Sequence, residues 1–196
     1  MKSFLKFGFT ALGLVLILLG VASLLTYTQL DKIGKYAIEN VLDKSFSGGG
    51  SVENVTVSPF DQSIDIIGLK LANPDTFKDG EAVECGRVHI EFDPKTVFAR
   101  PPVIQRVVVE DAEVSYRYEV GEGTNIGALA KEAQASILKS FTFLVRELDC
   151  KGVKVHFNTN LLPMARVGVD LINIHMDDLS KDEPVRTVDV LSLIHI

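Results

Sequence analysis

The pattern of apolar and polar positions divides the chain into three parts. Residues 7–25 are uncharged and mostly apolar, and no charged residue occurs between Lys6 and Asp31. Over residues 30–46 apolar side chains recur every three or four positions, which predicts an amphipathic helix. From Val52 onwards the period changes to two, which is typical of strands with one buried face and one solvated face. The pattern therefore predicts an apolar segment, a short helix and a β-rich domain, in that order.

The apolar segment has the length of a membrane-spanning helix. As a helix, residues 7–25 would extend about 28 Å, close to the thickness of the hydrocarbon core of a bilayer. A cleaved signal peptide is the alternative, but its apolar region usually has only about 7–15 residues. Lys2 and Lys6 precede the segment, and the positive-inside tendency places such a flank in the cytoplasm. We therefore expect a transmembrane anchor over residues 1–28, with the remaining chain across the membrane.

Residues 29–50 are the expected link between the anchor and the β-rich domain. The amphipathic helix within this link either lies on the membrane surface or packs on the domain behind it, and both alternatives fit its pattern. The Ser47–Ser51 segment contains three consecutive glycines, so we expect it to end the helix and to act as a short flexible joint.

The predicted β-rich domain spans residues 51–185 and consists of short strands, mostly in a meander. The clearest alternation runs over residues 112–120, where apolar residues at even positions alternate with polar residues at odd positions. Such alternation indicates an antiparallel sheet with one solvated face. An internal helix is predicted over residues 126–139, with Thr124 or Asn125 as its cap. We therefore expect an α+β fold with a mostly antiparallel sheet.

Local chemistry also predicts two turns and a strand boundary. Asn73-Pro74 indicates a turn, because proline disfavours helix for the residue before it. Lys151-Gly152 separates two alternating segments and indicates another turn. Residues 103–109 are more uniformly apolar than residues 112–120, so we expect these segments to form two paired strands.

Charge and cysteine content narrow the possible functions. The formal net charge is −6 and there is no basic run, so we do not expect nucleic-acid binding. Cys85 and Cys150 lack the spacing of a zinc site. They either form a disulfide in an oxidising compartment or remain two buried thiols on strands.

The sequence contains no recognisable catalytic arrangement. His89, His156 and His175 occupy outward positions of predicted strands, which are typical of solvated residues. The loop from Gly121 to Gly127 approaches a nucleotide-binding fingerprint, but its spacing is one residue off and the preceding strand has a solvated face. We therefore expect a protein that is not an enzyme and that uses no metal and no cofactor.

The apolar face of the sheet is the most distinctive feature of a chain tied to a membrane. One short helix cannot cover the apolar face of a large sheet, so the remainder must contact another sheet, a partner or a lipid. If lipid covers this remainder, the lipid-facing residues are Val88, Ile90, Phe92, Val114, Tyr116 and Tyr118.

Several motifs follow one another in a recognisable order. They are the Gly68 to Pro74 turn, a strand ending in VHIEFD, the segment PPVIQRVVVEDAEVSYRYE, Asn125-Ile126 and ELDCKGVKV. With this order the chain resembles the AsmA-like proteins of the bacterial envelope over nearly all of residues 1–185. The family often has Asn-Pro-x-Gly-Phe and Asn-Leu, where this chain has Asp75-Thr76-Phe77 and Asn125-Ile126.

The resemblance implies an inner-membrane anchor and a periplasmic sheet that curls into a groove with an apolar inside. It further implies a role in envelope biogenesis or in lipid transport between membranes, and it carries over no catalytic residues. The alternative is an anchored envelope scaffold or adaptor with a closed core, which binds a protein partner and no lipid. Residues 191–196 match the in-frame translation of a sequencing-adapter end, so we expect them to be foreign to the natural protein.

Overall fold

A computed structural model of the chain describes residues 29–77, 80–136, 138, 142–159, 167–171, 173–177 and 185–186. The expected anchor over residues 1–28 and the suspected foreign tail over residues 191–196 lie outside these ranges. Among the residues described, no helix is long and apolar enough to cross a membrane.

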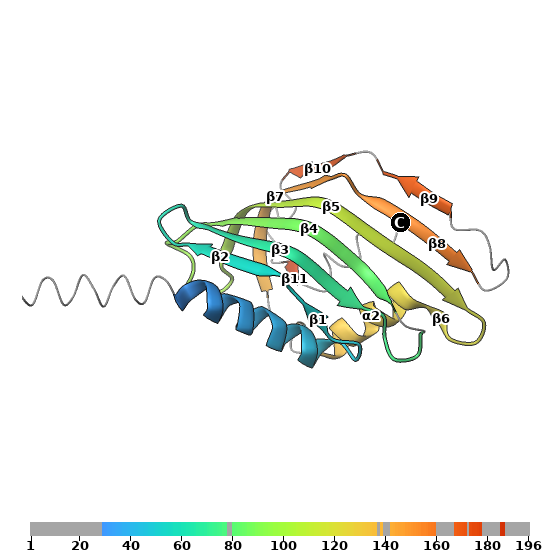
Figure 1. Cartoon of the computed structure of the whole chain (residues 1–196). Coiled ribbons are helices and arrows are strands. Elements are labelled where there is room, and N and C mark those ends of the chain that lie inside the picture. The colour runs from blue at the N-terminus through green and yellow to red at the C-terminus, as the bar shows by residue number, and fades with distance from the viewer. Residues whose placement is uncertain are drawn as a thin grey trace, which may run out of the picture.

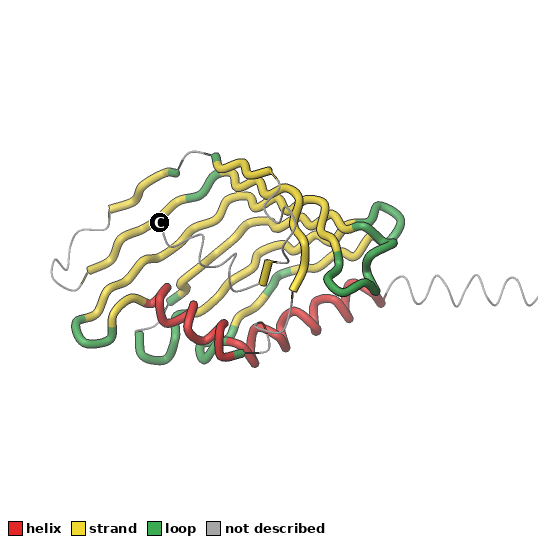
Figure 2. Tube along the Cα trace, turned by 180° about the vertical axis from the view of Figure 1, so that it is seen from behind, coloured by secondary structure: helices red, strands yellow, loops and turns green. Residues whose placement is uncertain are grey.

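The described part of the chain is mostly β-sheet with two helices (Figure 1). One helix spans residues 29–45, and the other is α2 (Asn125–Ala135). The strands are β1 (Gly50–Ser51), β2 (Asn54–Ser58), β3 (Ser63–Ala72), β4 (Glu81–Phe92), β5 (Val103–Glu119), β6 (Gly123–Thr124), β7 (Thr142–Lys151), β8 (Lys154–Thr159), β9 (Val167–Asp170), β10 (Ile174–Asp177) and β11 (Val185–Arg186). Figure 2 shows both helices along the same side of an open sheet. The expected α+β class is confirmed.

The sheet is mixed, with the central order β1-β3-β4-β5-β7-β10. β2 lies beside β3 in line with β1, and β8 lies beside β5 in line with β7. Most neighbouring strands are antiparallel, but β5 is parallel to both β7 and β8. Parallel neighbours need a crossover connection, and α2 lies in the connection between β5 and β7. The predicted simple meander is therefore wrong at this point.

Two predicted strand boundaries are also wrong. Residues 103–119 form the single strand β5, where two paired strands were expected. The expected turn at Lys151-Gly152 does not reverse the chain, because β7 and β8 follow the same neighbour, β5, in the same direction. Gly152 has a φ of +65°, and it interrupts the pairing without ending the run along β5. A glycine that indicates a turn in the sequence is here a break within a strand.

Gly152 belongs to a transverse line of irregular residues, which we call the crease. Gly68 in β3, Gly86 in β4 and Asp111 in β5 occupy positions where the pairing is skipped while the register is kept. Gly68 and Asp111 also have positive φ values, +63° and +54°. A Cβ atom on Gly152 would lie 2.7 Å from Asp111 Oδ1, so the aspartate side chain would have to move to admit any other residue there.

The crease changes which positions of each strand carry the apolar side chains. In β4 these are the odd positions Val83 and Cys85 on one side of the crease, and the even positions Val88 and Ile90 on the other. The same change occurs in β3 and β5, whose residues pair with them. The apolar side chains of both halves therefore face the two helices.

Both helices pack against this apolar face. The buried cluster consists of Phe46, Ala82, Leu129 and Ala133, with Leu42, Leu71, Val83, Ile126 and Leu138 packed around it. Near the start of the 29–45 helix, Asp31 Oδ1 accepts a hydrogen bond from Val57 N at 2.8 Å. Lys35 Nζ donates to Glu53 O at 3.0 Å. Of the two alternatives for this helix, the structure therefore has the one in which it packs on the domain.

Candidate functional site

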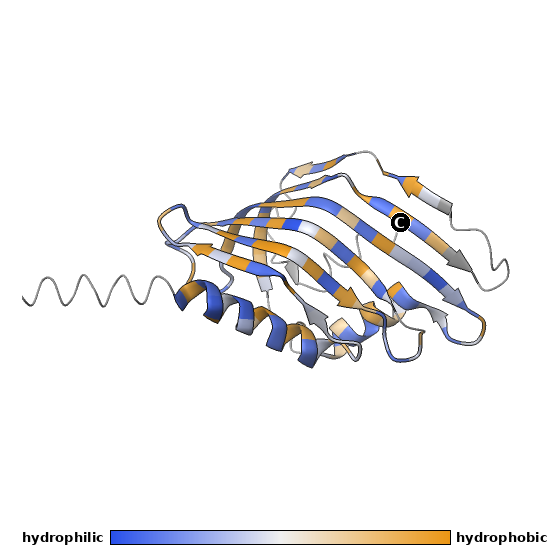
Figure 3. Ribbon diagram, in the orientation of Figure 1, coloured by the Kyte–Doolittle hydropathy of each residue, from blue (hydrophilic) through white to orange (hydrophobic). Residues whose placement is uncertain are grey.

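The predicted lipid-facing residues lie in β4 and β5, on both sides of the crease. Val88 and Ile90 are in β4, and Val114, Tyr116 and Tyr118 are in β5. Along these strands hydrophobic and hydrophilic residues alternate (Figure 3). Most of their cross-strand neighbours are apolar too, namely Ile64, Ile66, Val83, Val107, Val109, Val155 and Phe157. The sixth candidate, Phe92, follows a register shift at the end of β4 and pairs with Ile104.

These six side chains differ in how far they are exposed. Val114 is buried and belongs to the core. Val88, Ile90, Phe92 and Tyr116 are half-buried. Tyr118, near the end of β5, is exposed. The candidates therefore range from the buried Val114 to the exposed Tyr118 near the end of β5.

Sequence reasoning missed four exposed residues of the apolar face, namely Phe157, Val169, Leu171 and Ile174. Together with the predicted Tyr118 they are between 36% and 44% exposed, and we call these five residues the apolar strip. The Phe157 ring lies 5.5 Å from the ring of Tyr116, centroid to centroid. The strip follows from the parallel pairing of β5 with β8 and from the pairing of β8 with β9. The alternating pattern in the sequence marks residues of the strip as apolar positions. It does not reveal the strand order that brings them together.

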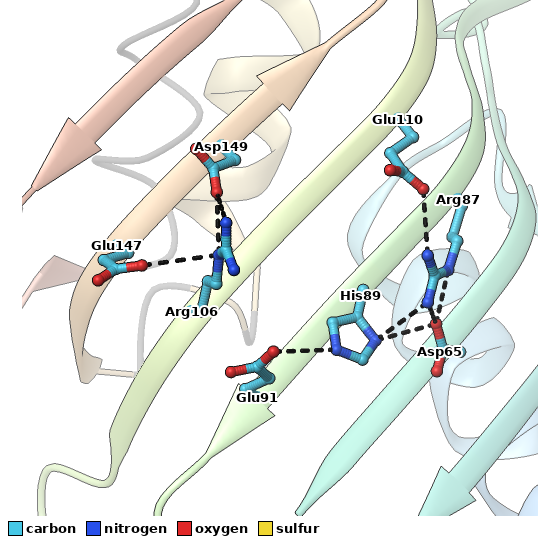
Figure 4. Close-up of polar contacts among 8 residues, drawn as sticks. All are labelled: Asp65, Arg87, His89, Glu91, Arg106, Glu110, Glu147 and Asp149. Carbon is cyan, nitrogen blue, oxygen red and sulfur yellow. Dashed lines mark hydrogen bonds and ion pairs between the residues drawn. The ribbon is translucent and has the colours of Figure 1, made fainter.

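The opposite face of the sheet carries a row of ionisable side chains that crosses from β3 to β10, which we call the charged row. Figure 4 shows the part of this row from β3 to β7. Its central line is Asp65, His89, Asp149 and His175, with Val108 between the two halves. The flanking members are Arg87, Glu91, Arg106, Glu110, Glu147 and Asp177. Every strand in the centre of the sheet except β1 contributes to it.

Two arginines join neighbouring strands within the charged row. Arg87 Nη2 lies 2.6 Å from Asp65 Oδ1, and its Nη1 lies 3.2 Å from Glu110 Oε2. Arg106 donates a hydrogen bond from Nε to Asp149 Oδ2 at 2.9 Å. These contacts connect β3, β4, β5 and β7 on the solvated face.

The three histidines singled out in the sequence all lie on this polar face, and all of them contact carboxylates. His89 Nδ1 lies 3.0 Å from Asp65 Oδ1, and His156 Nε2 lies 3.5 Å from Glu113 Oε2. His175 Nδ1 lies 2.5 Å from Asp149 Oδ1. Their outward direction was predictable, whereas their acidic partners depend on the strand register.

The contacts of the charged row shift the pKa values of its members. Burial by itself raises the pKa of Asp65, but hydrogen bonds from Arg87 and His89 outweigh it and leave this pKa below its usual value. The pKa of Asp149 is lowered by its hydrogen bonds with Arg106 and His175. Reciprocally, the hydrogen bond with Asp149 raises the pKa of His175. The row therefore favours the charged form of all three groups.

A buried polar contact joins two asparagines that stood out as motif residues in the sequence. Asn125 is fully buried, and its Nδ2 donates to Asn73 Oδ1 at 2.8 Å and to Ser115 O at 2.6 Å. Its Oδ1 accepts from Arg117 N at 2.8 Å and from Ile126 N at 2.9 Å. This contact, which we call the asparagine latch, ties the Asn-Pro turn and β5 to the start of α2.

The two cysteines do not form a disulfide. Cys85 and Cys150 are free thiols, in β4 and β7 with β5 between them. Two strand spacings amount to about 9–10 Å, beyond the Cα separation that a disulfide can bridge. Burial raises the pKa of both thiols, which disfavours the reactive thiolate. Of the two alternatives, the structure has the free thiols, with Cys85 buried and Cys150 half-buried.

The glycine-rich loop after β5 has no geometry that favours phosphate binding. It turns back through β6, which pairs with the end of β5. At the start of α2, Thr124 Oγ1 accepts a hydrogen bond from Gly127 N at 3.0 Å, as expected for a cap. The Ile126 N–H is bound by Asn125 Oδ1. Two of the amide groups at the helix start, where a phosphate would bind, are thus occupied by the chain's own side chains.

The solvated side of the crease holds a recess of about 370 Å³, lined by Glu53, Lys70, Glu84, Asp111 and Glu113 among others. Its carboxylates and its wide opening do not fit an acyl chain. Within the described ranges, no group of three or more histidine, cysteine or acidic side chains is placed to hold a metal ion.

These features define the class of structure: an open, mixed α+β sheet with one apolar face, partly covered by two helices, and one charged face. No protein-family model matches the chain, and its comparison with curated proteins gives no match. The resemblance to AsmA-like envelope proteins is therefore carried by the motifs alone.

Proposed function

We propose that this protein is a membrane-anchored, non-enzymatic protein of the bacterial envelope that binds or conducts lipid acyl chains. The anchor lies in the inner membrane with the N-terminus in the cytoplasm, and the sheet lies in the periplasm. The observation that carries the proposal is the apolar strip, where five large apolar side chains on neighbouring strands remain accessible on the face that elsewhere forms the core.

The mechanism is burial of apolar surface. Each methylene group of an acyl chain that leaves water contributes about 0.8 kcal/mol, so a strip of apolar side chains lowers the cost of holding a lipid tail outside a bilayer. The half-buried residues Val88, Ile90 and Tyr116 extend this face from the strip towards the helices. On this proposal the sheet curls around its apolar face to form the groove that the family resemblance implies.

The experiment is mass spectrometry of lipids that co-purify with residues 29–190 after export to a periplasm. This fragment keeps the 29–45 helix, which is part of the core. Wild-type protein should retain phospholipid or fatty acid in a fixed ratio, and Tyr118→Asp should lose it because a carboxylate then faces the acyl chain. Gln105→Asp is the matched control, since it adds the same charge at another exposed position of β5 and should leave binding intact.

Circular dichroism and thermal unfolding establish that each variant is folded. A folded wild-type fragment that carries no lipid would contradict the proposal. That result would favour the envelope scaffold instead, with the charged face as the surface that binds a protein partner.

A further inference from the structure

Two loops with exposed aromatic tips project side by side from one end of the sheet. One is the β2–β3 turn over residues 59–62, and the other is the β4–β5 loop over residues 93–102. Phe92 N, at the base of the second loop, donates a hydrogen bond to Gln62 O in the first at 2.9 Å. Phe60 is 87% exposed and Phe98 is 96% exposed, and Val97 beside it is also exposed.

Exposed apolar residues scattered singly over a surface are ordinary, but a group of them marks an interaction site. Here two phenylalanines and a valine stand in neighbouring loops, and all three are exposed and lie outside the buried cluster.

The same end of the sheet is where the 29–45 helix begins (Figures 1 and 2). The hydrogen bond between Asp31 and Val57, near the end of β2, fixes that helix start beside the β2–β3 loop. The apolar segment of residues 7–25 lies immediately before it in the chain, separated only by residues 26–28. Three residues reach at most about 10 Å, so a bilayer that holds the segment must lie close to the loop tips.

We propose that Phe60, Val97 and Phe98 insert into the membrane interface beside the anchor and hold the sheet in a fixed orientation on the bilayer. This inference rests on the anchor in the proposed function, but not on lipid binding by the sheet. Apolar side chains of interfacial segments reach about 5–10 Å into the headgroup and acyl boundary, which suits residues at the tips of short loops.

The charges around the tips indicate what kind of bilayer they fit. Asp61, Asp93, Lys95 and Arg100 are the charged residues of the two loops, so their charges balance. Asp93 Oδ1 is engaged locally, accepting a hydrogen bond from Lys95 N at 2.9 Å. The attraction is therefore apolar, and zwitterionic lipid suffices without a polybasic contribution from the loops.

The chain contains no tryptophan, so single tryptophans report on chosen sites without background. The test uses the full chain in phosphatidylcholine vesicles with acyl chains brominated near the glycerol end, because bromine quenches tryptophan that contacts the lipid. Phe60→Trp and Phe98→Trp place the reporter at the tips, and tryptophan suits an interfacial position. Val120→Trp is the matched control in the exposed turn at the opposite end of β5. Tyr118→Trp reports separately on the apolar strip.

We expect the protein to float with the vesicles and the tryptophans at positions 60 and 98 to lose most of their emission, while that at position 120 keeps it. High salt should not restore the emission. Floating protein with unquenched tips, or with tips and control quenched equally, overturns the docking. Protein that stays in solution overturns both the docking and the anchor. If the tips are quenched but the tryptophan at position 118 is not, the result contradicts only the proposal that the sheet binds lipid. The docking of the loop tips and lipid binding by the sheet can therefore fail separately.

Discussion

The asparagine latch gives the sharpest prediction about what holds the domain together. Asn125→Ala removes the amide that bridges Asn73, the Ser115 carbonyl and the Arg117 N–H, all within 2.8 Å of it. The alanine side chain offers neither a donor nor an acceptor to the groups that Asn125 bound. Because the position has no solvent exposure, water does not replace the lost amide. The turn before β4, the C-terminal part of β5 and the start of α2 lose their common connection.

The expected magnitude follows from the groups left behind. A buried polar group that loses its partner costs about 1–3 kcal/mol. The Ser115 carbonyl and the Arg117 N–H are the two main groups that lose their partner. Because the surrounding structure relaxes in part, we expect a loss of about 3 kcal/mol in the free energy of unfolding. Since small domains are stable by only about 5–15 kcal/mol, the variant should fold but should unfold at a clearly lower urea concentration.

Urea unfolding followed by circular dichroism measures this loss. Asn54→Ala is the matched control, because Asn54 is an exposed asparagine whose side chain makes only a 3.5 Å contact with Thr56. The control should change the free energy of unfolding by less than about 0.5 kcal/mol. If Asn125→Ala behaves like the control, the latch does not stabilise the domain and the argument from buried amide partners is refuted.

A second variant at this position predicts a pH dependence. Asn125→Asp keeps the oxygen that accepts from Arg117 N and Ile126 N, but it places a carboxylate oxygen against Asn73 Oδ1 and the Ser115 carbonyl. Burial and these acceptors raise the pKa of the new carboxyl in the folded state. The variant should therefore be least stable at neutral pH, and should regain stability as the pH falls and the carboxyl becomes a donor.

Three further outcomes are expected. The contact of His175 with Asp149 requires both charges, so it weakens as the pH rises through the raised pKa of His175 and as it falls through the lowered pKa of Asp149. The protection of the β10 amides against hydrogen exchange, taken relative to the intrinsic exchange rate at each pH, should thus be greatest between the ordinary values of about 4 and 6.5, and His175→Ala should remove the change on the neutral side. Gly152→Ala should lower the free energy of unfolding by about 1–2 kcal/mol because of its left-handed backbone, and Gly152→Asn should cost less, as thermal unfolding can show. Cys85 and Cys150 should react with a thiol reagent only after denaturation, since both are free and shielded; a native disulfide would leave neither to react.

The faces of the strands could be predicted from the sequence because they depend on a local period. Val88 and Ile90 alternate with His89 in the sequence, and the structure places the histidine on the charged face and its neighbours on the apolar face. The helix start at Thr124 was predictable for the same reason, since a cap is a contact over three residues. Such features need no knowledge of the strand order.

The strand order itself depends on packing that no local pattern records. A turn and a crease both favour glycine with a positive φ, so Gly152 indicated a reversal that the chain does not make. Only the parallel return of β7 along β5 shows that Asp111 is its partner. The apolar strip was missed for the same reason, because Phe157 reaches Tyr116 only through that parallel pairing.

The loop tips, the crease and most of the apolar strip follow one another along the strands, which relates the two proposals. The loop tips lie at one end of the strands, and most of the apolar strip lies beyond the crease, towards the other end. Val88 and Ile90 lie between the two, on the apolar face of the half that is nearer the tips. A lipid tail that moves from the bilayer to the strip along β4 and β5 would therefore pass Ile90.

The position of Ile90 predicts that uptake of lipid from vesicles and binding of a fatty acid supplied directly respond differently to a charge there. Ile90→Asp places a charge on the path but not in the strip, so the full chain in vesicles should load the strip poorly, as read by quenching of a tryptophan at position 118. The same variant in detergent should still bind a brominated fatty acid added directly. Ile90→Val keeps the path apolar and should load normally, and unfolding curves must show both variants folded. Equal loading of the two variants from vesicles would mean that lipid reaches the strip by another route, because a buried charge on the path would otherwise oppose the passage of an acyl chain.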